Sequence, residues 1–150
     1  MTRILMVCLG NICRSPLAEG ILRSKVPDDK VIVDSAGTGS YHIGDPPDSR
    51  SIAVARKYSI DITHLRGRQF STLDFEKFDL IYVMDESNYE NVIHLARNEE
   101  DKAKVKFILD EVYPDQHYNV PDPYHGGSHH FESVFRMLDE ACSSIASKFI

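Results

Sequence analysis

The fold and the chemistry are decided by one stretch near the N-terminus, Ile4-Leu5-Met6-Val7-Cys8-Leu9-Gly10-Asn11-Ile12-Cys13-Arg14-Ser15-Pro16. Its first part is a continuous apolar run, which predicts a buried strand that ends at Cys8. Ser15 is a favoured N-cap and Pro16 suits the first helical position, so we predict that a helix begins here. A strand, a tight loop and a helix N-terminus in succession predict an anion site, because free backbone N–H groups and the positive end of the helix dipole point at one spot.

The composition bounds the class of protein. The chain has 150 residues, of which 42% are hydrophobic and 27% charged, and this predicts one globular domain over residues 1–150. The net charge of −6 argues against a nucleic-acid or membrane-surface partner, because such proteins carry basic surfaces. No apolar run approaches the roughly 20 residues of a membrane span or forms a signal-peptide core. Three cysteines are too few for a disulfide framework, so we expect a cytoplasmic protein.

Apolar runs and helical patterns alternate along the chain. Short continuous runs predict buried strands over residues 4–8, 31–33, 80–84 and 106–109. Helical periodicity covers residues 16–25, 48–58, 86–98 and 128–149, and places Cys142 in the core. The alternation predicts a three-layer α/β fold with a mostly parallel sheet, whose ligands bind beyond the carboxyl ends of the strands. Residues 35–47 and 113–128 are predicted as long loops, which in a compact domain are usually functional.

The residues of the first loop suit phosphoryl transfer. Backbone N–H groups between Leu9 and Arg14 can hold the phosphoryl oxygens, and Gly10 allows the backbone to approach closely. Arg14 offers a planar fork that matches two oxygens at once. We expect Cys8 to be a thiolate nucleophile at neutral pH, because a helix N-terminus and an arginine both stabilise the negative charge. Asn11 tolerates the left-handed conformation that such a loop needs, and Ser15 is placed to hydrogen-bond the sulfur.

Displacement by a thiolate also needs a general acid. The leaving oxygen must be protonated, and the water that later attacks phosphorus must be deprotonated. Asp122 is the best-placed carboxyl group, because Pro121 and Pro123 stiffen its loop. Turn formation by Asp-Pro is the alternative interpretation of this segment.

With these residues assembled, the chain resembles the low-molecular-weight protein tyrosine phosphatases. Val7-Cys8-Leu9-Gly10-Asn11-Ile12-Cys13-Arg14-Ser15-Pro16 is similar to their signature, and Asp122-Pro123-Tyr124 is similar to their acid loop. Supporting similarity lies in Asp34-Ser35-Ala36-Gly37-Thr38, in Gly44-Asp45-Pro46-Pro47-Asp48-Ser49-Arg50 and in Met84-Asp85-Glu86-Ser87-Asn88. The resemblance covers essentially the whole chain. It implies a four-stranded parallel sheet in the flavodoxin-like order 2-1-3-4, with helices on both faces.

The resemblance also implies roles for single residues. It implies that Cys8 becomes phosphocysteine, that Arg14 clamps the phosphate and that Asp122 acts as acid and then as base. The implied substrate-binding set is Leu9, Gly10, Asn11, Ile12, Cys13, Ser15, Tyr41 and Tyr124, with Ser35 and His64 supporting the loop. The implied partners are a phosphotyrosine protein and an oxyanion in the loop, with no metal or other cofactor, and the expected state is a monomer or weak homodimer. Two departures are His125, where many members carry a second tyrosine, and Tyr41, where tryptophan is common.

Further residues leave alternatives open. Cys13 either forms a reversible, protective disulfide with Cys8, as similar family members are thought to do, or is an inert thiol. The histidines of residues 125–130 match no strong metal-ligand spacing and are interpreted as surface residues. Arg66 and Arg68 either extend the positive potential around the cleft or form a solvated turn, and the solvated turn is the favoured interpretation. Arsenate reduction is the alternative enzyme activity, disfavoured because residues 80–100 contain no relay cysteine. A phosphate-sensing domain is the non-enzyme alternative, disfavoured because binding needs neither Cys8 nor Asp122.

Overall fold

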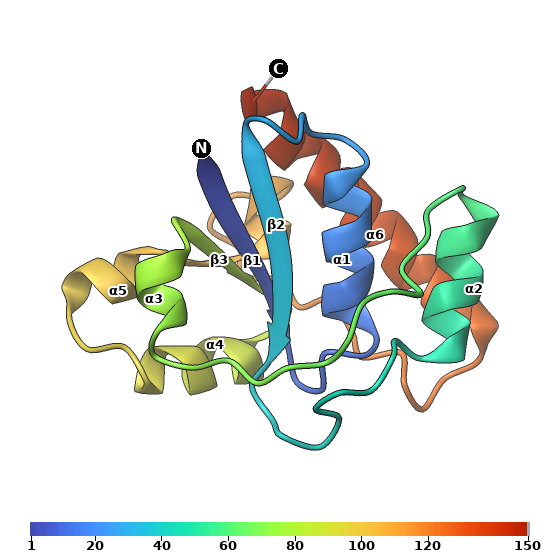
Figure 1. Cartoon of the computed structure of the whole chain (residues 1–150), viewed down its shortest axis with the longest axis horizontal. Coiled ribbons are helices and arrows are strands. Elements are labelled where there is room, and N and C mark those ends of the chain that lie inside the picture. The colour runs from blue at the N-terminus through green and yellow to red at the C-terminus, as the bar shows by residue number, and fades with distance from the viewer. Residues whose placement is uncertain (150) are drawn as a thin grey trace.

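The central element is a parallel sheet whose middle strand is buried on both faces. The computed structural model describes residues 1–149. Strands β1 (Thr2–Cys8), β2 (Val31–Gly37), β3 (Leu80–Val83) and β4 (Val105–Phe107) all run parallel in the order β2-β1-β3-β4 (Figure 1). Every residue from Ile4 to Cys8 is at most 2% exposed, as expected of a strand covered on both sides. The predicted order of strands is confirmed.

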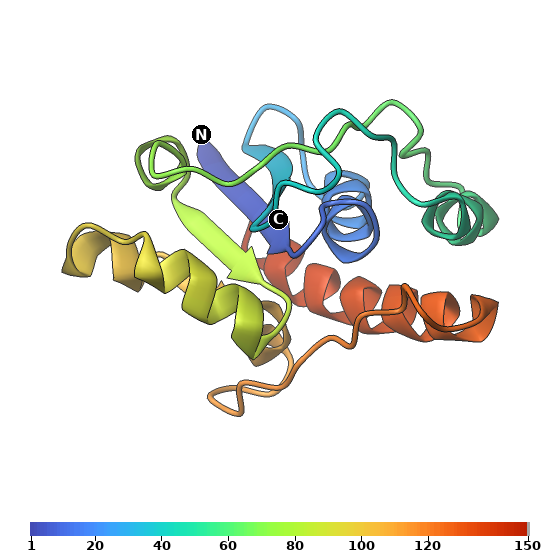
Figure 2. The ribbon, with the colours of Figure 1, turned by 90° about the horizontal axis from the view of Figure 1, so that it is seen from below.

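Helices cover the two faces of the sheet. Helices α1 (Arg14–Arg23), α2 (Ser49–Lys57) and α6 (Ser128–Ala146) lie on one side, and α3 (Asp74–Lys77), α4 (Glu86–His94) and α5 (Glu99–Ala103) on the other (Figures 1 and 2). Short 3₁₀ helices follow β4 (Ile108–Glu111) and α6 (Ser147–Phe149). Side chains alternate along β1, so Ile4 and Met6 belong to the core under α1 and α6 and Leu5 and Val7 to the core under α3 and α4. This confirms the three-layer α/β architecture.

Several predicted boundaries are wrong, each for a local reason. β2 continues through Ser35 to Gly37, where a loop was predicted, because it pairs with β1 over that whole length. The helix predicted over residues 86–98 is two helices, since the Asn98 side chain accepts the Asp101 N–H and starts α5 anew. Ser15 is not an N-cap: α1 begins at Arg14 after Cys13, and the Ser15 hydroxyl has other partners. Cys142 is fully buried, as predicted.

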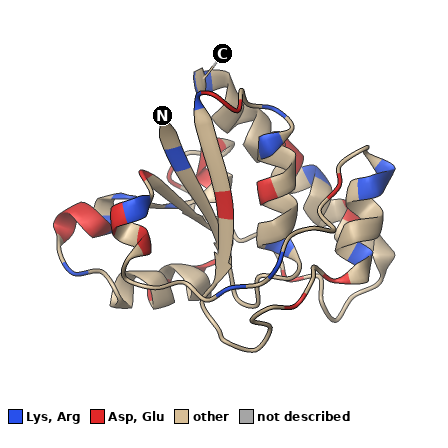
Figure 3. Ribbon diagram, in the orientation of Figure 1, with Lys and Arg blue, Asp and Glu red and all other residues tan. Residues whose placement is uncertain are grey.

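Few charged residues lie on the strands of the sheet. Basic and acidic residues are both distributed over helices and loops, and the strands carry few (Figure 3). Among residues 1–149, no helix is both long enough and apolar enough to cross a membrane.

The end of β2 supports the loop that follows β1. The Thr38 N–H donates to the Cys8 carbonyl oxygen and the Gly39 N–H to that of Leu9, each at 2.9 Å. The two backbones are so close that a Cβ on Gly37 would lie 2.7 Å from the Leu9 carbonyl oxygen. Gly37 is therefore required by space rather than by its backbone dihedral angles.

We predict that Gly37→Ala lowers the free energy of unfolding by about 1–3 kcal/mol, because backbone on both sides must shift. Gly39→Ala is the matched control: its Cβ would meet the ring of Tyr41 at 2.8 Å, but that side chain is exposed and can move. We expect the control to change stability by less than about 0.5 kcal/mol. Urea denaturation of the two variants measures the difference, and equal losses would contradict the prediction.

Candidate active site

The cysteine loop (residues 8–14) joins β1 to α1 and encloses the Cys8 sulfur. Cys8 is 2% exposed, with its Sγ 3.0 Å from the Ser15 Oγ. The Asn11 N–H donates to the same sulfur at 3.3 Å. Asn11 has a φ of 57°, so its left-handed conformation is confirmed. The turn at Asn11 folds the loop back over the thiol and directs donors at it.

A buried hydrogen-bond network holds this loop in shape. Asn11 Nδ2 donates to Ser15 Oγ at 2.8 Å and to Ser35 Oγ at 2.9 Å. The Ser35 hydroxyl donates in turn to Glu19 Oε1 at 2.7 Å, and the Arg68 N–H donates to Asn11 Oδ1 at 3.0 Å. The network therefore connects the loop to α1, to β2 and to the segment before α3.

Arg14 is a buried cation with carboxylates around it. Its Nη1 donates to Asp85 Oδ2 at 2.6 Å and to the Val120 carbonyl oxygen at 2.9 Å, and its Nη2 lies 3.7 Å from Asp122 Oδ2. Burial works to lower the pKa of Arg14, but the negative charges of Cys8, Asp85 and Asp122 raise it above its ordinary value. The guanidinium is therefore permanently charged and fixed in orientation beside the sulfur.

Asp122 comes to the same place from far along the chain. It lies in the acid loop (residues 119–127), which has no helix or strand and precedes α6. The Val120 N–H donates to the Met84 carbonyl oxygen at the end of β3, at 2.7 Å, which brings the loop to the carboxyl edge of the sheet. The Asp122 side chain is 45% exposed, and its Oδ1 accepts the Tyr124 N–H at 3.1 Å. The carboxyl group is thus held near Arg14 yet accessible to solvent.

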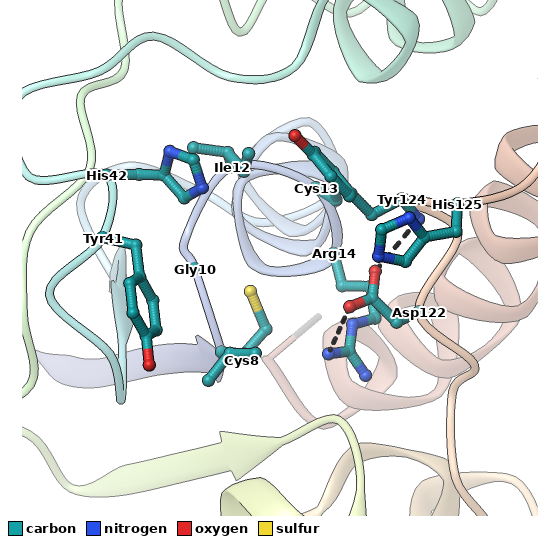
Figure 4. Close-up of a pocket in the computed structure, with 11 residues that line it drawn as sticks. Cys8, Gly10, Ile12, Cys13, Arg14, Tyr41, His42, Asp122, Tyr124 and His125 are labelled. Atoms are coloured by element: carbon teal, nitrogen blue, oxygen red, sulfur yellow. Dashed lines mark hydrogen bonds and ion pairs between the residues drawn. The ribbon is translucent and has the colours of Figure 1, made fainter.

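These groups line one cavity of about 210 Å³. The Cys8 sulfur points into the space between Tyr41 on one side and Asp122 and Tyr124 on the other (Figure 4). Tyr41 and Tyr124 are exposed aromatic side chains at the rim. The complete lining is Cys8, Leu9, Gly10, Ile12, Cys13, Arg14, Tyr41, His42, Asp122, Tyr124 and His125.

Cys13 lines the cavity as a neutral thiol. It is buried, and burial together with the nearby charges of Asp48, Cys8 and Asp122 raises its pKa to about 12. All three cysteines of the chain are free in this structure. At neutral pH Cys13 therefore keeps its proton.

The structure does not bring every expected residue to the loop. His64 is exposed and makes no hydrogen bond within residues 1–149; the Arg68 N–H and Glu19 occupy the ends of the supporting network instead. Arg68 is more than part of a solvated turn, because its guanidinium bridges Asp34 and Asp74. In the same described part of the chain, no group of three His, Cys, Asp or Glu side chains is placed to hold a metal ion.

Sequence reasoning missed four contributors to the site. Asp85 follows β3 directly, so the rule that ligands bind at the carboxyl edge of the sheet would have found it. Glu19, one helical turn after Ser15, gave no signal beyond a carboxylate on the buried face of α1. Arg68 binds Asn11 and Asp34, which are distant in the sequence, and the ring of His42 lies near Gly10. Neither contact leaves a local pattern in the sequence.

The comparisons with known proteins agree with this geometry. The family model described as low molecular weight phosphotyrosine protein phosphatase matches residues 3–149. The low molecular weight phosphotyrosine protein phosphatase of Gallus gallus is 39% identical over 150 residues, which cover 97% of this chain and 94% of the relative.

Solved structures give the same result. A protein tyrosine phosphatase from Entamoeba histolytica, with Hepes in its active site, superposes with a TM-score of 0.91 at 36% identity, covering 99% of this chain and 96% of that one. Vibrio vulnificus Wzb in complex with benzylphosphonate has a TM-score of 0.88 at 31% identity, covering 98% of each chain. The chain therefore belongs to the low molecular weight phosphotyrosine protein phosphatases and is a protein tyrosine phosphatase.

Proposed function

We propose that this protein hydrolyses phosphotyrosine, and small aryl phosphates, through a phosphocysteine intermediate. The observation that carries the proposal is the meeting of a thiol, a guanidinium and a carboxyl group in one small cavity. Binding an oxyanion needs the guanidinium and backbone donors alone, whereas a buried sulfur facing a carboxyl group suits a displacement reaction.

In the first step the Cys8 sulfur attacks phosphorus and the bond from phosphorus to the tyrosine oxygen breaks. Asp122, protonated, gives its proton to that oxygen, so that a neutral phenol leaves. In the second step the Asp122 carboxylate takes a proton from water, and the water oxygen attacks phosphorus. The sulfur–phosphorus bond breaks, inorganic phosphate is released and the Cys8 thiolate is regenerated.

The phosphoryl oxygens would be held by N–H groups that have no hydrogen-bond partner within residues 1–149. The backbone N–H groups of Leu9, Gly10, Ile12 and Cys13 donate no hydrogen bond within residues 1–149. Arg14 Nε is buried and likewise without a partner among these residues, while Nη1 is held by Asp85 and the Val120 carbonyl. Fixed donors of this kind stabilise charge that develops on the equatorial oxygens in the transition state.

The rim of the cavity suits an aromatic ester. Tyr41 and Tyr124 are 76% and 41% exposed and flank the mouth, so a phenyl ring can lie between two aromatic faces. The Vibrio vulnificus relative is described with benzylphosphonate, a phosphonate next to a phenyl ring. We infer that these two side chains select aryl over alkyl phosphates.

Location and assembly stay predictions. Free cysteines fit a reducing compartment such as the cytoplasm. A monomer or weak homodimer is the expected state.

The first prediction tests the nucleophile. Cys8→Ser should abolish turnover of aryl phosphates while inorganic phosphate and arylphosphonates still bind, because the backbone donors and Arg14 remain. Steady-state kinetics measures turnover, and calorimetric titration with phosphate measures binding. Residual turnover above the uncatalysed rate would remove the phosphocysteine mechanism.

The second prediction tests the general acid. Asp122→Asn keeps the shape and the bond to the Tyr124 N–H but cannot supply a proton, so kcat/KM for phosphotyrosine should fall about 10²–10⁴-fold. For p-nitrophenyl phosphate, kcat/KM should fall far less, because the p-nitrophenolate leaving group does not need to be protonated. Equal losses on both substrates would show that Asp122 is not the acid.

We propose further that Cys13 protects Cys8 from irreversible oxidation. Peroxide would oxidise the Cys8 thiolate to a sulfenic acid and be reduced to water. The Cys13 thiol would then attack the sulfenic sulfur: the S–S bond forms, the S–O bond breaks, and the hydroxyl leaves as water with the proton of Cys13. A thiol reductant reopens the disulfide. Both cysteines lie on the wall of one cavity, five positions apart in a curved loop.

The third prediction follows from this step. After mild peroxide, mass mapping should find a Cys8–Cys13 bridge, and dithiothreitol should restore activity. Cys13→Ser should lose activity irreversibly under the same treatment. A sulfonic acid on Cys8 of the unaltered protein, without a bridge, would reject the protective role.

A further inference from the structure

Arg50 links α2 to the backbone of the acid loop. Its Nη2 donates to the Tyr124 carbonyl oxygen at 2.9 Å and its Nη1 to the Gly126 carbonyl oxygen at 3.0 Å. The guanidinium also lies over two rings, with its Cζ 4.5 Å from the centroid of Phe131 and 5.6 Å from that of Tyr124. The Arg50 side chain thus contacts Tyr124 and Gly126 of the acid loop and Phe131 near the start of α6.

The guanidinium cannot turn away, because Asp48 holds it from the other side. Arg50 Nε donates to Asp48 Oδ1 and Nη2 to Asp48 Oδ2, both at 3.0 Å, in a bidentate pair. The same carboxylate caps α2 by accepting the Arg50 N–H, and hydrogen bonds from Arg50 hold the pKa of Asp48 below its usual range. The Asp48 N–H donates to the Ile12 carbonyl oxygen at 2.8 Å, so this pair is itself fixed to the cysteine loop.

The part of the acid loop after Asp122 receives few other hydrogen bonds from the rest of the protein. Before Asp122, the loop is fixed through Val120, whose N–H and carbonyl bind Met84 and Arg14. Within residues 1–149, the His130 N–H at the start of α6 donates to the Gly127 carbonyl oxygen at the end of the loop. Apart from that bond, the two bonds from Arg50 are the only ones that reach residues 123–127 from another helix, strand or loop. Asp122 therefore lies between one anchor at Arg14 and a second at Arg50.

We propose that Arg50 is a positioning residue that holds Asp122 at the distance from the cysteine loop that proton transfer requires. The inference rests on the proposed role of Asp122 as the general acid. Arg50 itself contacts no reacting atom: it binds carbonyl oxygens of Tyr124 and Gly126, and the Tyr124 N–H in turn binds the Asp122 carboxylate at 3.1 Å. Removing the Arg50 side chain would free the acid loop on one side of Asp122. A small displacement of a catalytic group lowers the reaction rate strongly.

The fourth prediction tests the path through Asp122 by a double-mutant cycle. Arg50→Met is made alone and together with Asp122→Asn, and kcat/KM is measured on phosphotyrosine and on p-nitrophenyl phosphate. This parameter covers the steps up to release of the phenol, where the acid acts. We expect Arg50→Met alone to lower kcat/KM about tenfold for phosphotyrosine, which is a part of the roughly 10²–10⁴-fold that a general acid supplies, and less than about twofold for p-nitrophenyl phosphate. In the Asp122→Asn background the same change should have almost no effect.

Two further variants separate positioning from charge and from folding. Arg50→Lys keeps a cation beside Asp48, but the three N–H groups of an ammonium cannot reproduce the four bonds that the guanidinium makes to the carboxylate and the two carbonyl oxygens, so it should show the same leaving-group dependence. Arg136→Met removes another arginine, exposed on α6 and paired with Glu132, and should leave both substrates unaffected. Inhibition by inorganic phosphate should be unchanged in all Arg50 variants, since the cysteine loop is intact.

The outcomes test the positioning role of Arg50 separately from the role of Asp122 as the general acid. If Arg50→Met or Arg50→Lys slows both substrates equally, or slows phosphotyrosine hydrolysis as much in the Asp122→Asn background as alone, the positioning role is wrong. If Asp122→Asn itself shows no leaving-group dependence, the assignment of the acid has failed instead. Should the methionine variant not fold, the lysine variant carries the same comparison.

Discussion

The geometry of the site depends on the side chain of Asn11. A non-glycine residue in the left-handed conformation costs roughly 1–2 kcal/mol, and that conformation turns the loop back over Cys8. The cost is offset because the amide uses both N–H groups and its oxygen, toward Ser15, Ser35 and the Arg68 N–H. Each such bond contributes about 1 kcal/mol net, whereas a buried group left without a partner costs about 1–3 kcal/mol. The loop is therefore stable in this shape only while the whole network is complete.

That network ends at a buried carboxyl group, which ties the loop to the core. Glu19 is 2% exposed, and burial raises its pKa while the hydrogen bond from Ser35 and the charge of Arg23 oppose the rise. Its position on α1 and that of Ser35 on β2 mean that the loop cannot change shape without moving elements of the main core. Electrostatic stabilisation of a transition state requires donors that are already in position, because moving donors into position costs free energy that offsets part of the stabilisation.

Much of this molecule could be predicted from local patterns, and the limits of prediction follow from physics. The apolar runs gave the strands because strands buried on both faces need continuous hydrophobicity, and the fold then placed Cys8 at the carboxyl edge. Asp122 was predicted as the acid because the proposed reaction needs one and because Pro121 and Pro123 mark a stiff loop. Glu19 and the Arg68 N–H were missed, and His64 was expected in their place, because hydrogen-bond partners across the tertiary structure leave no periodic signal. The bonds from Arg50 to the acid loop could not be predicted from the sequence either, because their acceptors are main-chain carbonyl oxygens, which every residue type has.

The two arginines around Asp122 also explain how an irregular loop can hold the proposed general acid in place. A segment without helix or strand has few backbone bonds of its own, so its position is set by what other elements donate to it. Arg14 supplies the bond at Val120 and Arg50 the bonds at Tyr124 and Gly126, and both are in turn fixed by carboxylates, Asp85 and Asp48. Because Arg14 is also the proposed phosphate clamp, oxyanion binding and placement of the acid share one guanidinium. Damage at Arg14 should therefore weaken both functions, whereas damage at Arg50 leaves the oxyanion site whole.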